Sequence, residues 1–137
     1  MIEPSDRESL INYRLEQAKE TIELSNFLLK ADKLTVSVNR IYYGMYYAVT
    51  ALALKYSFET SKHAQLLGWF NKEFVATGIV EKRLGKSLRI AFQNRTKGDY
   101  DAYVTFEKEE VEQMQIDLIE FVEKIERIIT PTPNTRL

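Results

Sequence analysis

The sequence contains no cysteine and only one histidine, and both scarcities exclude classes of chemistry. Without cysteine there can be no disulfide bond, no thiolate nucleophile and no zinc site with sulfur ligands. The single histidine, His63, cannot supply a histidine pair for a metal ion, and no set of carboxylate co-ligands is indicated around it. We therefore expect no bound metal, and the lack of thiols agrees with a reducing compartment.

Long apolar runs are absent as well. No stretch approaches the roughly 18 residues of a membrane span, and residues 1–10 are polar and acidic, unlike a secretion signal. The sequence also has no glycine-rich phosphate loop and no dinucleotide fingerprint. We expect a cytoplasmic protein with no membrane association and no cofactor.

What the sequence does contain is the composition of an ordinary globular domain. Its 137 residues fit one domain, because chains usually divide only beyond that size. Apolar residues make up 45% of the chain and charged residues 28%, which is enough to bury a core.

The charges are segregated along the chain. Residues 62–97 carry eight basic and two acidic side chains, whereas residues 99–126 carry ten acidic and two basic ones. Two interpretations are open. Neighbouring helices can complement each other within the fold, or the basic segment can bind an anionic ligand such as RNA or a nucleotide.

Apolar residues recur at three- and four-residue intervals along five segments, the period of an amphipathic α-helix. We expect helices near residues 5–30, 32–57, 60–78, 81–97 and 105–129. Their start signals are a Ser5–Glu8 capping box and the N-cap candidates Asp32, Thr60 or Ser61, and Thr105. Their end signals are Gly78 as a left-handed cap, a break at Gly98-Asp99, and Pro131 with Pro133.

No useful strand alternation appears, so the predicted fold class is all-α: a four- to five-helix up-and-down bundle in a single domain. The bundle should cover residues 5–129, and residues 130–137 should form a disordered C-terminal tail. The second predicted helix is apolar almost all round and must be covered on more than one side.

That helix carries four tyrosines within six positions. If Tyr42 and Met45 face the core, then Arg40, Tyr43, Gly44 and Tyr47 share roughly the opposite face. The tyrosines can be amphipathic core residues with hydroxyls at the rim. Alternatively, Arg40, Tyr43 and Tyr47 form a partner or dimer face, with Gly44 allowing close approach of a second backbone.

His63 falls in the first turn of the third predicted helix, where the helix dipole disfavours its protonated form. We expect a neutral imidazole that bridges polar groups. A catalytic role needs a nucleophile or carboxylate partner that the sequence does not indicate.

A dense polar run, Asn94 to Tyr100, lies at the end of the fourth predicted helix. Arginine binds phosphate or carboxylate in a bidentate manner. We take Arg95 as the candidate anion or RNA contact, with Asn94, Lys97 and Arg89 beside it. The competing interpretation is that an Arg95–Asp99 pair simply closes the helix.

Four segments in this order resemble the HEPN superfamily: Arg40–Ala48, Lys62-His63, Phe70–Phe74 leading to Gly78, and Arg95–Asp101. The resemblance covers about Ser5 to Ile129, and the sequence is similar to small stand-alone prokaryotic HEPN proteins. It implies a helical bundle that forms a homodimer. Such proteins are often encoded beside a minimal nucleotidyltransferase in toxin–antitoxin pairs.

Active members of this superfamily are metal-independent ribonucleases with an arginine followed, after four to six residues, by a histidine. Arg95 matches that arginine, but Tyr100 occupies the earliest histidine position and no histidine follows His63. A phenol with a pKa of about 10 is a poor proton-transfer group near neutral pH. Members adenylylated by their partner keep a further tyrosine, and here Ala102 occupies that position, which leaves Tyr100 and Tyr103 as candidate acceptors.

The first hypothesis is therefore a non-catalytic HEPN protein, not an enzyme, that dimerises and binds a nucleotidyltransferase partner, RNA or a nucleotide through Arg95. The alternative is a divergent metal-independent ribonuclease toxin in which Arg95 acts with His63 or Tyr100. In a third interpretation the Arg95 cluster only stabilises the fold.

Overall fold

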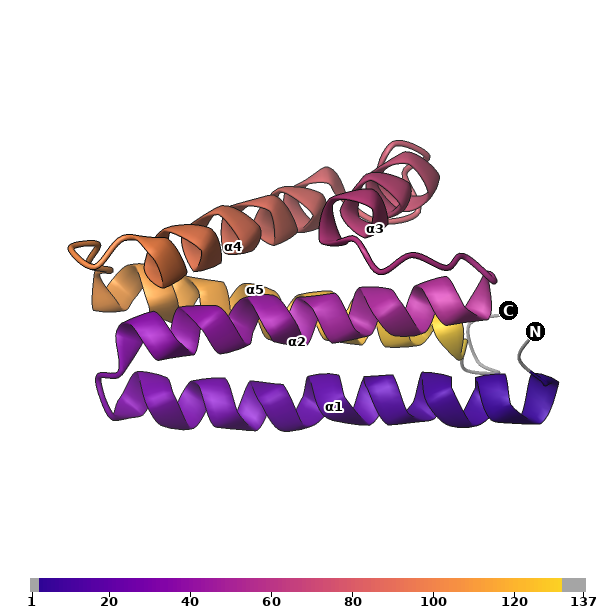
Figure 1. Ribbon diagram of the computed structural model, residues 1–137, viewed down its shortest axis with the longest axis horizontal. Helices are drawn as coiled ribbons and strands as arrows, with labels where there is room; N and C mark the ends of the chain where they lie inside the picture. Colours follow the sequence, from indigo (N-terminus) through magenta and orange to yellow (C-terminus); the bar gives the residue numbers. More distant parts are fainter. Residues whose placement is uncertain (1–2, 132–137) are drawn as a thin grey trace.

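The computed structural model describes residues 3–131, and these form five α-helices and one short π-helical segment. The elements are α1 (Pro4–Lys30), α2 (Leu34–Lys55), α3 (His63–Phe70), η1 (Asn71–Val75), α4 (Lys82–Tyr100) and α5 (Lys108–Ile129). Figure 1 shows α1, α2 and α5 side by side along the long axis, with α4 inclined above them; α3 packs on α2, and η1, which follows it, packs on α4. The described residues contain no strand, so the prediction of a single all-α bundle is confirmed.

Helix α2 lies at the centre of the bundle and packs against α1, α3, α4 and α5. Its apolar residues are therefore buried on several sides, and Val38, Ile41, Tyr42 and Val49 have no exposed surface. This confirms that the second helix is covered on more than one side. The burial comes from the chain's own helices, because each of the four neighbours contributes an apolar stripe.

Several predicted helix starts are wrong. Helix α1 begins at Pro4 after the N-cap Glu3, and Ser5 makes no capping hydrogen bond. Proline suits this position because its missing N–H would have had no partner in the first turn. Asp32 does not cap α2. It takes a left-handed conformation, φ 60°, and the Lys33 N–H donates to the Leu28 carbonyl, so Asp32 ends α1 as a Schellman turn.

The third and fifth helices also begin later than predicted. The Thr60 hydroxyl accepts a hydrogen bond from the Lys62 N–H, and α3 starts at His63. Ser61 is likewise outside the helix. Thr105 precedes the buried Phe106, and the N-cap of α5 is Glu107. In each case a turn or a buried side chain, which local sequence does not reveal, determines where the helix begins.

The predicted break at Gly98-Asp99 is wrong, and α4 continues to Tyr100. Gly98 lies close to α2, and a Cβ atom at this position would lie 3.2 Å from Thr35 Cγ2. By contrast, the left-handed turn at Gly78 is confirmed with φ 84°.

Of the predicted C-terminal tail, Thr130 and Pro131 follow α5, and residues 132–137 lie outside the described residues. Within the described part of the chain, no helix is both long and apolar enough to cross a membrane.

Candidate functional site

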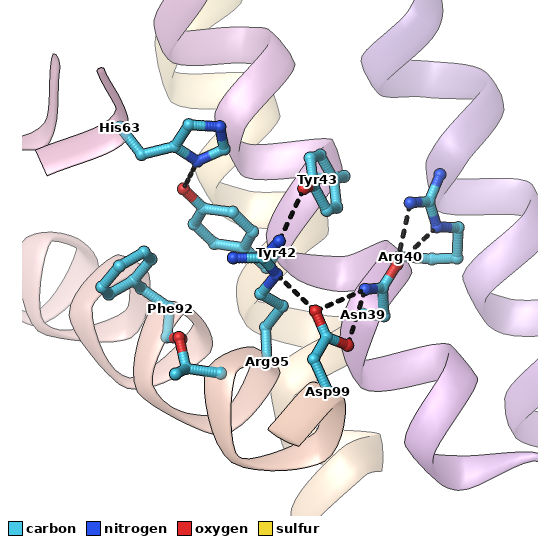
Figure 2. A network of polar contacts seen from close by, with 9 residues as sticks. Asn39, Arg40, Tyr42, Tyr43, His63, Phe92, Arg95 and Asp99 are labelled. Carbon is cyan, nitrogen blue, oxygen red and sulfur yellow. Dashed lines mark hydrogen bonds and ion pairs between the residues drawn. The ribbon is translucent and has the colours of Figure 1, made fainter.

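A polar cluster forms around Tyr42, where α2 meets the start of α3 and the second half of α4 (Figure 2). Tyr42 is fully buried. Its hydroxyl lies 2.7 Å from His63 Nδ1, and the guanidinium carbon of Arg95 lies 5.6 Å from the centroid of its ring. Phe92 packs on the same ring, with centroids 5.4 Å apart. The phenol of Tyr42 therefore stands between His63 and Arg95.

The hydrogen bond between Tyr42 and His63 indicates which ring nitrogen of His63 carries the proton. Burial raises the pKa of Tyr42 above its ordinary value, so the phenol keeps its proton. Within residues 3–131 the Tyr42 hydroxyl makes no other hydrogen bond. A buried hydroxyl proton needs an acceptor, and His63 Nδ1 is the one in reach. The neutral imidazole therefore accepts at Nδ1 and carries its own proton on Nε2.

The structure favours the neutral form of His63. Burial lowers the pKa of His63 below its ordinary value, and the positive charge of Arg95 lowers it further. The ring also stacks on Tyr46, with centroids 4.1 Å apart. The direction agrees with the expectation of a neutral imidazole, and burial and the Arg95 charge are the causes.

Arg95 is held on several sides and only one fifth of its side chain is exposed. Its Nη2 donates to the Tyr43 hydroxyl at 2.9 Å, and its guanidinium also lies over the Tyr43 ring at 5.2 Å. Its Nε lies 2.9 Å from Asp99 Oδ2, but the buried N–H is not aimed at that oxygen, so the contact is an ion pair rather than a hydrogen bond. No hydrogen bond to residues 3–131 occupies Nη1.

The network continues from Asp99 to the N-terminal part of α2. Asn39 Nδ2 donates to Asp99 Oδ1 at 3.2 Å, while Asn39 Oδ1 accepts from Nε and Nη2 of Arg40 at 3.0 and 2.8 Å. Arg40 also lies over the Tyr43 ring at 4.9 Å. Two guanidinium groups and one carboxylate thus share a small region, which leaves the cluster with a net positive charge.

The other predicted anion contacts do not join this cluster. Asn94 is buried and its amide contacts Met114 Sδ in the core at 3.6 Å. The side chain of Tyr100 is 82% exposed at the end of α4. Arg89 and Lys97 are exposed along α4. The structure thus brings together Arg95 and His63, but neither Asn94 nor Tyr100 joins them.

The predicted partner face on α2 needs one correction. Arg40, Tyr43 and Tyr47 are partly exposed. Gly44 is buried within the bundle, because a Cβ atom there would lie 2.8 Å from Leu118 Cδ1 of α5. Gly44 therefore allows close packing of this chain's own helices and does not belong to an outward face.

The charge segregation is partly used inside the fold. Arg83 of α4 pairs with Glu120 of α5, and Lys124 of α5 lies 3.3 Å from Glu81 at the start of α4. The Arg83–Glu120 contact joins a base of residues 62–97 to an acid of residues 99–126 and so supports complementation between neighbouring helices. The Lys124–Glu81 contact joins the minority charges of the two segments.

Sequence reasoning missed the roles of Asn39 and Tyr46, and it assigned Tyr42 only to the core. A signal was present, because Asn39, Tyr42, Tyr43 and Tyr46 follow helical spacing and border the same edge of α2. Within residues 3–131, histidine, aspartate and glutamate side chains form no group of three that could hold a metal ion.

Comparison with known proteins gives consistent relatives. A family model described as HEPN domain matches residues 11–129. A UPF0332 protein of Thermotoga maritima is 40% identical over 125 residues, which cover 91% of this chain and 95% of that protein. A Methanocaldococcus jannaschii protein named as a candidate toxin is 35% identical over 100 residues, or 73% of this chain and 68% of its own. A second protein of that organism with the same designation is 27% identical over 115 residues, which cover 84% of this chain and 85% of that protein.

Proposed function

The chain belongs to the HEPN family, and from this premise we propose that it is a non-catalytic binding protein that holds a phosphate group at Arg95. The phosphate belongs to RNA or to a nucleotide. The protein acts as a homodimer in the cytoplasm, in a toxin–antitoxin setting with a nucleotidyltransferase partner. Relatives named as candidate toxins support that setting.

The hydrogen bond between Tyr42 and His63 is the observation that carries the proposal. A ribonuclease must take a proton from the attacking hydroxyl, and imidazole is the side chain best suited to this near neutral pH. His63 is the one histidine of the sequence, and it meets Arg95 at Tyr42. Its basic nitrogen, Nδ1, already accepts from the buried Tyr42 hydroxyl at 2.7 Å. The remaining nitrogen, Nε2, carries a proton and can donate to a phosphate oxygen, but it cannot act as a base.

Arg95 suits anion binding because its neighbours hold the guanidinium in one orientation. Asp99 and Tyr43 engage Nε and Nη2, and the Tyr42 and Tyr43 rings lie beside its plane. Little side-chain entropy is then lost when Nη1 donates to a phosphate. The nearby Arg40 adds positive charge, which favours an anion over a neutral ligand.

Binding of a fluorescein-labelled oligouridine, followed by anisotropy, tests this proposal. Arg95→Ala should weaken binding by about tenfold or more, because a hydrogen bond to a charged group contributes roughly 1.5–3 kcal/mol and 1.4 kcal/mol corresponds to tenfold. The affinity of Arg95→Lys should lie between those of the parent protein and Arg95→Ala, since lysine keeps the charge but lacks the planar, bidentate guanidinium. Arg127→Ala, at an exposed arginine on α5, is the matched control.

Circular dichroism and thermal unfolding of each variant separate binding from folding. If Arg95→Ala keeps its fold and binds RNA and competing nucleotides as well as the parent protein, the proposal is wrong. If Arg95→Ala unfolds the protein while Arg95→Lys folds and binds normally, the cluster has a structural role only.

A second candidate function is a divergent metal-independent ribonuclease. It is favoured by the placement of His63 and Arg95 on two sides of Tyr42, close enough for the Arg95 charge to lower the His63 pKa. Purified protein should then cleave RNA in the presence of a chelator, and both His63→Ala and Arg95→Ala should abolish cleavage. Such a result would overturn the non-catalytic proposal. If Tyr100→Phe, rather than His63→Ala, abolished RNA cleavage, the proton transfer would be assigned to Tyr100.

A further inference from the structure

The outer face of α4 carries a row of exposed cations. Lys82, Lys86, Arg89 and Lys97 follow one another at intervals that place them on one side of the helix. Among residues 3–131 none of these four takes part in an ion pair. On the adjoining side of the same helix, Arg83 is paired with Glu120 and Glu81. The fold therefore neutralises one side of α4 and leaves the outer side positive.

The first part of this face is hollowed. Residues of η1 and the turn after it (Asn71, Val75, Ala76) and residues of α4 (Lys82, Gly85, Lys86, Arg89) enclose a groove of about 370 Å³. The groove exists because η1 sits directly on α4: a Cβ atom on Gly85 would lie 2.9 Å from both methyl carbons of Val75. Three cations thus surround one concave site.

A second hollow follows along the same helix. Phe92, Gln93, Thr96 and Lys97 line an open depression of about 520 Å³. It combines an aromatic ring, a side-chain amide and a hydroxyl with one cation. Such a set suits a nucleic-acid base, which stacks on an aromatic face and forms hydrogen bonds at its edge.

We propose that the outer face of α4 binds a single strand of RNA, with phosphates in the Lys82–Lys86–Arg89 groove and a base in the Phe92–Thr96 hollow. The inference goes beyond the proposed function, because this face is separate from the Arg95 cluster, which faces α2, and it names a polynucleotide strand as the ligand. From Lys82 to Lys97 the helix rises about 22 Å, enough for several nucleotides. A mononucleotide or free phosphate would occupy one part of this face only.

A protein partner fits this face less well. Among residues 3–131 the large exposed apolar side chains lie on α1, α2, α5 and the connecting segments, and α4 contributes only Tyr100 at its end. Protein interfaces need an apolar centre within a polar rim. A row of cations with two hollows, of which one holds the single ring of Phe92, matches a phosphate backbone with spaced bases.

The test compares two triple variants with equal loss of charge. Lys82→Gln/Lys86→Gln/Arg89→Gln removes the groove cations, and Lys30→Gln/Lys33→Gln/Arg127→Gln removes exposed cations elsewhere. Oligouridine affinity is measured by anisotropy over a range of salt concentrations. The groove variant should bind about tenfold or more weakly, and its log K against log salt slope should fall by about 2, since each single-strand phosphate contact contributes about 0.7. The control variant should keep the parent slope.

Equal slopes for the two triple variants would overturn the inference, because the cations would then act only through net charge. Oligoglutamate that competes as well as oligouridine would also overturn it and indicate an acidic protein partner. If UMP alone displaced oligouridine completely at similar concentrations, the ligand of this face would be a mononucleotide and not an RNA strand. Arg95→Ala, measured in parallel, separates this inference from the proposed function. If Arg95→Ala weakens oligouridine binding and the groove variant does not, only the strand on α4 is refuted. If the groove variant weakens binding and Arg95→Ala does not, only the Arg95 site is refuted.

Discussion

Removal of the Tyr42 hydroxyl is the most informative single change. Tyr42→Phe keeps the buried ring and its packing against Phe92 and Arg95 but removes the hydrogen bond to His63 Nδ1. A hydrogen bond contributes about 1 kcal/mol net, and up to about 3 kcal/mol when its loss leaves a buried partner unsatisfied. His63 is only partly buried, so we expect a loss near the lower figure, about 1 kcal/mol.

Urea unfolding measures that loss, and NMR titration follows the second consequence. In the parent protein the Tyr42 hydroxyl stabilises the neutral imidazole by donating to it, so Tyr42→Phe should raise the His63 pKa toward its ordinary value. The ring should remain largely neutral near pH 7, because burial and the Arg95 charge persist. Tyr47→Phe is the control, since the Tyr47 hydroxyl makes no hydrogen bond within residues 3–131.

Two results would refute the reasoning. If Tyr42→Phe changes neither the free energy of unfolding nor the His63 titration, the hydroxyl does not donate to Nδ1. If the ¹⁵N chemical shifts of the parent protein show a protonated Nδ1 and an unprotonated Nε2, the ring has a free basic nitrogen. The ribonuclease would then be the better supported function.

The remaining predictions concern packing and pH. Gly68→Ala should raise the free energy of unfolding by up to about 1 kcal/mol, since no atom lies within 4 Å of the new Cβ and alanine favours helix. Gly44→Ala should lower it by about 1 kcal/mol, because a Cβ lies 2.8 Å from Leu118 Cδ1 and overpacking costs roughly 1–3 kcal/mol; equal effects of the two changes in urea unfolding would contradict this. The pKa of His63 is lowered on folding, so the stability it contributes is present above the unfolded value of about 6.5 and is lost as the pH falls through the folded value. The difference in unfolding free energy between the parent protein and His63→Asn should therefore shrink from pH 7.5 to pH 5.5, and a constant difference would contradict it.

The helical periodicity was sufficient to predict the architecture. Apolar side chains at three- and four-residue intervals partition to one side of each helix whatever their neighbours are, so five helices and their order followed from the sequence. The Arg95–Asp99 ion pair, at i and i+4, was also open to prediction, because helical spacing alone brings the two side chains together.

Helix boundaries were less predictable because backbone hydrogen bonds and neighbouring elements compete with side-chain caps. Asp32 illustrates this. Its residue type suits an N-cap, yet it serves as the left-handed end of α1 and its carboxylate binds Lys108 of α5 at 2.8 Å. Gly98 illustrates the opposite case, where a residue typical of a break remains helical at a position that lies close to α2.

The sequence by itself determined the all-α bundle, the buried face of Tyr42 and the place of Arg95 near the end of α4. Only the tertiary structure decided that His63 and Arg95 meet at Tyr42, because the three residues come from different helices and no local spacing relates them. It also decided the protonation of His63. Burial of the Tyr42 hydroxyl leaves its proton with one acceptor, and that contact takes the basic nitrogen a ribonuclease would need.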